Sequence, residues 1–466
     1  MSQSPTRVIA EKIVETGIDD VPADAIRVAK DLVFDTVTCM LAGAADHGSR
    51  LVQEYAVASG PGDVTIAGTD LTASTFMAAM CTGTAAAILD WDDNSWRVIG
   101  HPSGILVPAA FALGEELGAS GRQVLEAYII GHETIGEVSM GTGMSAPAFV
   151  NGRHNTGTFG IFGATAVAAK LLGLDVEQVQ VAFGIAGSCS AALRCAFGTE
   201  TIGLHSGQAA ANGIMSARLA ATGFTAQTDV LERKYGFADV FLPGGGYDLS
   251  QTGKSWANPW DLLDPIEGPG IKLFPGATTL FCAGECAMEI ATRHNVKPDD
   301  IERIEWRHTA KMPMIMGAGS YGVPENTKQA GFSIPWSIAN GLVDGHIGLA
   351  SFEAESLKDP VKRALCAKVE LSIHPDLETI PDQRQNVAGE LVVHLKDGSR
   401  HEHMRRVPRT YPGGEPLTRE QLVGKYREGA IRVLDEERME ALIPVLDEFD
   451  SLPDISVLTK MLGTSA

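Results

Sequence analysis

From Arg7 to about Phe224, apolar residues recur with the spacing of an α-helix. One such stripe, preceded by a Pro and Asp start signal, consists of Ile26, Ala29, Leu32, Val33 and Val37. The segments that begin at Thr75, Gly104 and Thr158 are apolar nearly all round, which is typical of helices buried in a bundle or against a partner subunit. We therefore predict a long all-helical region, starting with an amphipathic helix at the N-terminus.

The pattern changes in the Pro- and Gly-rich stretch from Pro259 to Gly270, which we interpret as a crossing between domains. Three strand-like runs follow, and the last is bent at Asp397-Gly398, a strong hairpin signal. The runs are Ile301 to His308, Ala367 to His374 and Glu390 to Val407, accompanied by helical segments at Ala283 to His294 and Ser333 to Val343.

The helical period returns from Arg419 to Leu446, and we expect this tail to rejoin the first domain. One face of it would carry Leu422, Tyr426, Ala430, Val433, Leu434 and Leu442. The predicted fold is mainly α: a discontinuous helical domain of residues 1–266 and 409–466, and a smaller α/β lid domain of residues 267–408. A chain of 466 residues agrees with two cores, since single cores stop growing at roughly 250–300 residues.

Composition narrows the range of partners. The formal net charge of −21 repels nucleic acid and anionic lipid, and no apolar run reaches the ~20 residues that span a bilayer. Seven scattered cysteines make no disulfide framework, and the N-terminus lacks a secretion signal, so we expect a reducing cytoplasm. We expect no nucleic acid and no membrane as partners. If so acidic a protein binds carboxylates, it must gather its cations locally. Isolated arginines near sequence motifs are therefore candidate binding residues.

The first cluster of chemically active residues runs from Leu89 to Ser103. It holds Asp92, Asp93, Arg97 and His101 directly after an apolar helical segment. Neighbouring carboxylates raise each other's pKa, and a histidine titrates near neutral pH, so the cluster suits proton transfer. The alternative is helix capping in a surface loop. Its spacing matches no dedicated metal motif, and we predict no metal.

The second cluster, Asn151 to Gly160, is a glycine-rich polar loop that opens into an apolar helix. Arg153 could clamp a carboxylate with two hydrogen bonds, and His154 would stand beside it as acid or base. The alternative is a structural histidine in front of a helix capped by Asn155 or Thr156.

A third stretch, Ala192 to Ala210, links two helices and carries Arg194 and His205. Either side chain could contact a substrate carboxylate or bond to backbone carbonyls, and we favour the second role for His205. Cys189 and Cys195 have no obvious base partner, so we interpret them as small core residues. The chain shows no Gly-x-Ser-x-Gly elbow, phosphate loop or dinucleotide fingerprint.

Several motifs together resemble the MmgE/PrpD family over most of the chain. They are DWDD…GHPS, GRHNTGTFG, KLLGLD, FGT…LHSGQAA and FSIPW. The resemblance implies a cofactor-free homodimeric enzyme with a large helical domain and a smaller α/β lid, acting on small di- and tricarboxylates. It places the site in the cleft between domains, with Asp93, His101 and His154 as catalytic residues.

The chain also departs from the family pattern. Ile202 stands where many members have a lysine, Leu280 lies where a histidine is usual, and Trp336 replaces a tyrosine. Fewer cations favour a less charged or bulkier substrate. The predicted substrate-binding residues are Asp92, Arg97, Arg153, Arg194, Lys272 and Trp336.

Three functions agree with these residues. The leading one is a lyase, a dehydratase or decarboxylase, that abstracts a proton next to a carboxylate or carbonyl, with Asp93 as the acid or as the group that orients a histidine. An epimerase or isomerase of a dicarboxylate could use the same residues on opposite faces of the substrate. The third is a non-catalytic homologue.

Overall fold

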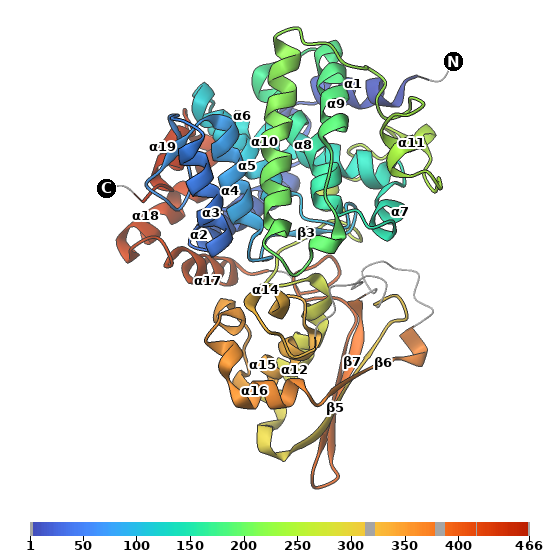
Figure 1. Cartoon of the computed structure of the whole chain (residues 1–466), viewed down its shortest axis with the longest axis vertical. Helices are drawn as coiled ribbons and strands as arrows, with labels where there is room; N and C mark the ends of the chain where they lie inside the picture. Colours follow the sequence, from blue (N-terminus) through green and yellow to red (C-terminus); the bar gives the residue numbers. More distant parts are fainter. Residues whose placement is uncertain (1–2, 313–321, 378–386, 416, 465–466) are drawn as a thin grey trace. The chain divides into compact units, whose positions relative to one another are not determined.

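The computed structural model describes residues 3–312, 322–377, 387–415 and 417–464, and Figure 1 shows their path. The chain divides into two compact units. Unit 1 comprises Met1–Arg194, Thr201–Asp264 and Thr418–Ala466, and unit 2 comprises Cys195–Glu200 and Pro265–Leu417. The sequence predicts a helical domain of residues 1–266 and 409–466 and a lid domain of residues 267–408, and these domain limits stay predictions.

Unit 1 is helical, as the apolar spacing predicts, and α1 confirms the amphipathic start of the chain. Its longer helices are α1 (Pro5–Glu15), α2 (Ala23–Ala44), α3 (His47–Ala58), α4 (Thr75–Ala87), α5 (Ser103–Leu117), α6 (Gly121–Gly136), α8 (Asn155–Leu172), α9 (Val176–Cys189), α10 (Thr201–Ala221), α17 (Arg419–Ala430) and α18 (Glu436–Asp447). Short helices are α7 (Ser145–Val150), α11 (Phe237–Phe241) and α19 (Ser456–Met461), and β1 (Val64–Thr65) pairs with β2 (Thr72–Ala73).

Helices α4, α5, α8 and α10 form the centre of unit 1, and small residues let them approach closely. A Cβ built on Gly207 of α10 would lie 2.2 Å from the carbonyl oxygen of Met80 in α4. Real Cβ atoms never come that near to a backbone oxygen, so only glycine allows this crossing. Within the described residues, no helix combines the length and the apolar character needed to cross a membrane.

The C-terminal tail differs from the single helical face expected for residues 419–446. Helix α17 ends at Ala430, and α18 begins at Glu436 after Asp435. The Asp435 side chain accepts a hydrogen bond from the Arg438 N–H, so it caps a new helix and the continuous face is interrupted. The expected stripe is therefore divided between two helices.

Unit 2 contains a four-stranded sheet in the order β6-β5-β7-β8. The strands are β5 (Ile301–His308), β6 (Val369–Ile373), β7 (Gly389–Leu395) and β8 (Arg400–Arg405), and its helices are α12 (Phe281–His294), α14 (Thr327–Ala330), α15 (Ile334–Asp344) and α16 (Pro360–Cys366). The three predicted strands are confirmed, and the Asp397-Gly398 hairpin joins β7 to β8, with Gly398 at φ +86°. Strands β5 and β6 are parallel, whereas β5–β7 and β7–β8 are antiparallel.

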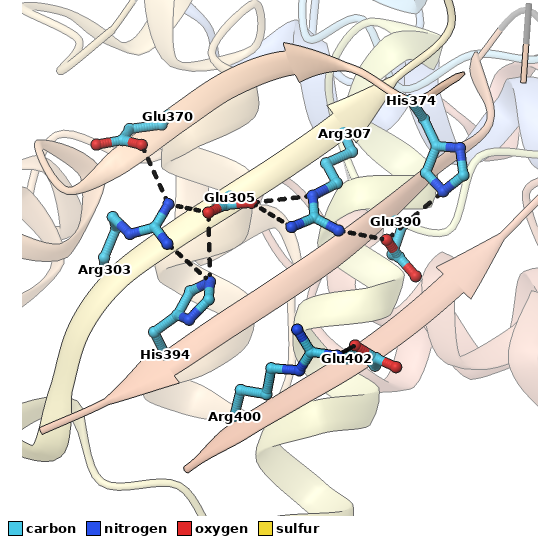
Figure 2. A network of polar contacts seen from close by, with 9 residues as sticks. All are labelled: Arg303, Glu305, Arg307, Glu370, His374, Glu390, His394, Arg400 and Glu402. Carbon is cyan, nitrogen blue, oxygen red and sulfur yellow. Dashed lines mark hydrogen bonds and ion pairs between the residues drawn. The ribbon is translucent and has the colours of Figure 1, made fainter. Parts of the chain in front are cut away.

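One face of this sheet packs against α12, and the other carries a network of ion pairs (Figure 2). Glu305 contacts Arg303, Arg307 (2.6 Å) and His394 (3.3 Å), and Arg307 also reaches Glu390 at 3.2 Å. Period-two alternation places all these side chains on one face. The cations and carboxylates of this face therefore pair with one another across the strands.

Candidate functional site

The loop that joins α4 to α5, residues 88–102, carries the first polar cluster. Asp90 and Ile99 both adopt φ +53°, a left-handed conformation that is uncommon for residues other than glycine. Ser95 and Gly100 exchange two backbone hydrogen bonds, which close the loop on itself. The loop, called the acidic loop below, therefore has a defined and strained shape.

The Asp93 carboxylate points at the first residue of α5. It accepts hydrogen bonds from the Ser103 N–H (3.0 Å) and the Ser103 hydroxyl (2.7 Å), and that hydroxyl lies 2.8 Å from the Tyr128 hydroxyl. Burial, followed by the charge of Asp92, raises the pKa of Asp93 to about 7, against the opposing effect of Ser103 and His101. An ionised Asp93 can only accept hydrogen bonds, so the single hydroxyl proton of Ser103 points at Asp93. The Ser103 oxygen is then the acceptor in its bond with Tyr128, and the Tyr128 hydroxyl is the donor.

His101 is oriented by the backbone of Asp93. Its Nδ1 lies 2.7 Å from the Asp93 carbonyl oxygen, and a carbonyl can only accept a hydrogen bond. Nδ1 therefore carries the proton, which leaves Nε2 as the basic nitrogen. Nε2 lies 3.7 Å from Asp90 Oδ1, and the His101 side chain keeps 15% of its surface exposed. This geometry prepares Nε2 to exchange a proton with a bound molecule.

The start of α8 brings the second polar cluster to the first. His154 is the N-cap residue of this helix, but its side chain makes no capping hydrogen bond. Asn155 Nδ2 donates instead to the carbonyl oxygens of Val98 (2.7 Å) and Ser145 (2.8 Å), and the Thr156 hydroxyl accepts from the His101 N–H at 3.1 Å. The alternative of a cap by Asn155 or Thr156 is therefore wrong, because both residues tie α8 to neighbouring loops.

His205 of α10 faces His154. Their Nδ1 atoms lie 2.9 Å apart, so one nitrogen donates and the other accepts. Burial lowers the pKa of His205 to about 4, which keeps this ring neutral at pH 7. The expected bond from His205 to a backbone carbonyl is not the contact that the structure shows. With His101 and His154 ring centroids 6.3 Å apart, three histidines form a continuous cluster.

The arginines of unit 1 have different surroundings. Arg97 is held by Asp261 (2.6 Å) and Asp264 (3.3 Å) and is 5% exposed, so carboxylates of the protein already match its charge. Arg153 lies over the ring of Phe241 at 4.4 Å. Arg194 stacks on the ring of Phe149 at 3.8 Å and donates to the carbonyl oxygen of that residue.

Arg153 and Arg194 flank the loop that carries His154. Arg153 pairs with Leu193 in a β-bridge, and the His154 N–H donates to the Ala192 carbonyl oxygen at 3.2 Å. Backbone contacts therefore place both arginines next to the histidine cluster.

Two predicted substrate-binding residues belong to unit 2. Lys272 is fully buried, and so is Trp336, whose indole N–H donates to the Ser351 carbonyl oxygen at 3.0 Å. Trp336 therefore serves the core of unit 2. The cysteines also differ from expectation: Cys189 is half-buried and Cys195 is exposed, so neither is a core residue.

Asp92 is 1% exposed and lies against the start of α5, where a Cβ on Gly104 would meet its Oδ2 at 2.6 Å. The ligand atoms of Asp90, Asp92 and His101 lie within 4.8 Å of one another, which is compact enough for a divalent ion. The absence of a metal stays a prediction.

Sequence comparisons cover both units. Residues 7–250 match the model of the MmgE/PrpD N-terminal domain, and residues 274–448 match that of the MmgE/PrpD C-terminal domain. Curated relatives include the cis-aconitate decarboxylase of Mus musculus, 28% identical over 99% of this chain and 94% of that protein. The cis-aconitate decarboxylase of Aspergillus terreus is 27% identical over 96% of this chain and 93% of that protein.

Proposed function

Because the chain belongs to the MmgE/PrpD family of enzymes, we propose that it is a cofactor-independent decarboxylase of a small unsaturated tricarboxylic acid, with cis-aconitate as the first substrate to test. The observation that carries the proposal is the orientation of His101. Its Nδ1–H is fixed on the Asp93 carbonyl, its Nε2 lies 3.7 Å from Asp90 Oδ1, and the centroids of the His101 and His154 rings are 6.3 Å apart. The names of the relatives, all decarboxylases or decarboxylase-like, favour this reaction over dehydration.

In the proposed reaction, the bond from carbon to one carboxylate breaks, and its electron pair stays on the carbon chain and is delocalised into the adjacent double bond. Carbon dioxide leaves, and the carbanion takes one proton. His101 in its protonated form delivers that proton from Nε2. The products are carbon dioxide and a dicarboxylate with one carbon fewer.

Asp93 has the orienting role in this scheme. Its carboxylate faces Ser103 and its carbonyl holds His101, so it controls the ring without touching the substrate. His154 is the second acid/base group, and the neutral His205 sets its tautomer. We place the substrate carboxylates near Arg153 and Arg194. Arg97 and Trp336 are left out of this set because their polar groups are engaged within the protein.

A second candidate is an epimerase. His101 and His154 are two acid/base groups with ring centroids 6.3 Å apart, and two such groups can serve opposite faces of one carbon. Such an enzyme would exchange the substrate proton with solvent and release no carbon dioxide.

The test is incubation of the purified protein with cis-aconitate and a panel of related di- and tricarboxylates in D2O. We expect carbon dioxide release and one deuterium on carbon in the product, both lost in His101→Gln. His346→Gln, an exposed histidine of unit 2, is the control and should match the wild type. Deuterium in unchanged substrate without carbon dioxide would favour the epimerase, and no turnover of any acid would refute both.

A further inference from the structure

The acidic loop rests on a lysine from the far end of the chain. Lys425 of α17 is 5% exposed, and its Nζ lies 2.5 Å from Asp35 Oδ1 of α2. The same ammonium donates to the carbonyl oxygen of Trp91 at 2.8 Å and lies 4.8 Å from the centre of the Trp91 ring. One buried cation therefore joins α2, α17 and the acidic loop.

The contact falls at the strained part of the loop. Trp91 is fully buried and stands between Asp90, with its positive φ, and Asp92. A non-glycine residue with positive φ is strained and persists only where the surroundings hold it. The hydrogen bond from Lys425 to the next carbonyl is one such restraint. It acts two residues before Asp93, whose own carbonyl orients His101.

Stability alone does not explain a lysine at this position. A buried ion pair gains little net free energy, because the loss of hydration offsets the attraction, and apolar residues of similar size often serve as well. Helix α17 is already anchored on α2 by Tyr426, which packs edge to face on Phe34 with centroids 5.3 Å apart. What an apolar side chain at position 425 could not provide is the donor to Trp91.

We propose that Lys425 is a positioning residue of the active site: with its charge held by Asp35, it fixes the Trp91 carbonyl and so sets the path of the acidic loop that carries Asp93 and His101. Its catalytic consequence rests on the proposed function. The groups that face the ammonium are Asp35 from α2, Asp92 and Trp91 from the loop, and Cys39 from α2. The buried Lys425 stays charged, since Asp35 and Cys39 raise its pKa against the effect of burial.

The experiment uses the full chain and a double-mutant cycle of Asp35→Asn and Lys425→Met. Lys425→Met alone leaves the Asp35 carboxylate buried without its cation and should be the least stable variant, with the lowest urea midpoint of unfolding. The double variant removes both charges and should recover much of that loss. The control is Arg427→Met, which lies on the same helix but forms an exposed ion pair with Glu440 at 2.6 Å.

The first readout needs no substrate. Hydrogen exchange of the peptide spanning residues 88–103 reports the backbone bonds between Ser95 and Gly100 and the bond from the Asp90 N–H to the Ala87 carbonyl. We expect at least tenfold faster exchange there in Lys425→Met and in the double variant, and wild-type rates in Arg427→Met. Wild-type exchange in the double variant would overturn the proposal, as would equal loosening in the Arg427 control.

The second readout is kinetic, on whichever acid the wild type turns over. A displaced proton donor lowers kcat more than it weakens binding, so kcat should fall roughly tenfold to a hundredfold in both Lys425 variants while KM changes less than about threefold. Recovery of wild-type kcat together with stability in the double variant would show a purely structural ion pair and overturn the proposal. If the wild type turned over no acid, the proposed function would fail, and the exchange rates would still decide the role of Lys425.

Discussion

Tyr128→Phe removes one hydroxyl from the chain of donors that ends on Asp93. Tyr128 and Ser103 are fully buried, and the Tyr128 hydroxyl donates to the Ser103 hydroxyl at 2.8 Å. The Ser103 hydroxyl in turn donates to Asp93 at 2.7 Å. Loss of the first donor weakens the second bond, so the ionised form of Asp93 becomes less favourable and its pKa rises.

The size of the effect follows from the two bonds. A hydrogen bond to a charged group contributes about 1.5–3 kcal/mol, so Ser103→Ala should raise the pKa of Asp93 from about 7 by a further ~1 to 2. Cooperative strengthening along a chain is perhaps 10–30% per bond, so Tyr128→Phe should raise it by only ~0.1 to 0.7. The pKa of Asp93 should therefore be highest in Ser103→Ala, intermediate in Tyr128→Phe and lowest in the wild type.

The assay is the pH dependence of kcat together with NMR titration of the labelled Asp93 carboxyl carbon. If ionised Asp93 is needed, the limb where activity rises with pH should move to higher pH in the same order. Tyr426→Phe is the matched control, since it also removes a buried hydroxyl from unit 1, one that donates to the Met439 carbonyl at 3.0 Å. Equal displacement in Tyr426→Phe, or no displacement in Ser103→Ala, would refute the reasoning.

Three further predictions concern stability and assembly. Burial lowers the pKa of His205 to about 4, so the neutral ring stabilises the fold above pH 6.5. This contribution to stability is lost as the pH falls from about 6.5 to 4. The difference in melting temperature between wild type and His205→Gln should therefore change over that range and stay constant above it. Arg97→Met leaves Asp261 and Asp264 without their buried cation and should cost about 3–5 kcal/mol in urea unfolding, whereas a loss below 1 kcal/mol would contradict the ion-pair geometry. Light scattering at micromolar concentration should give twice the mass of one chain, and a monomeric mass would contradict the homodimer.

The elements that the sequence predicts well are those with local signals. Strand β5 has the predicted limits, Ile301–His308, because apolar and charged residues alternate along it. The Asp397-Gly398 turn sets its own hairpin, and α12 and α15 begin within two residues of their expected starts. The break between α17 and α18 was missed, since apolar spacing continues across it and only Asp435 marks the new start.

The site shows the same division between local and distant information. The motif residues Asp93, His101 and His154 stand on loops that their own glycine, proline and asparagine content predicts, and their catalytic roles stay proposals. Ser103, Tyr128 and His205 depend on contacts between helices far apart in the chain, and Tyr128 has no local signal at all. Periodicity indicates which face of a helix is buried, but it does not determine which side chain of the next helix that face meets.

The glycine crossing of α4 and α10 has a consequence for variation of this enzyme. Gly207 lies two residues after His205, and its contact with Met80 allows no added atom. Any larger residue at position 207 must push the helices apart and carry His205 away from His154. The close approach of the two helix backbones thus sets the distance between the two histidines, so a variant that keeps the histidine pair must also keep glycine at position 207.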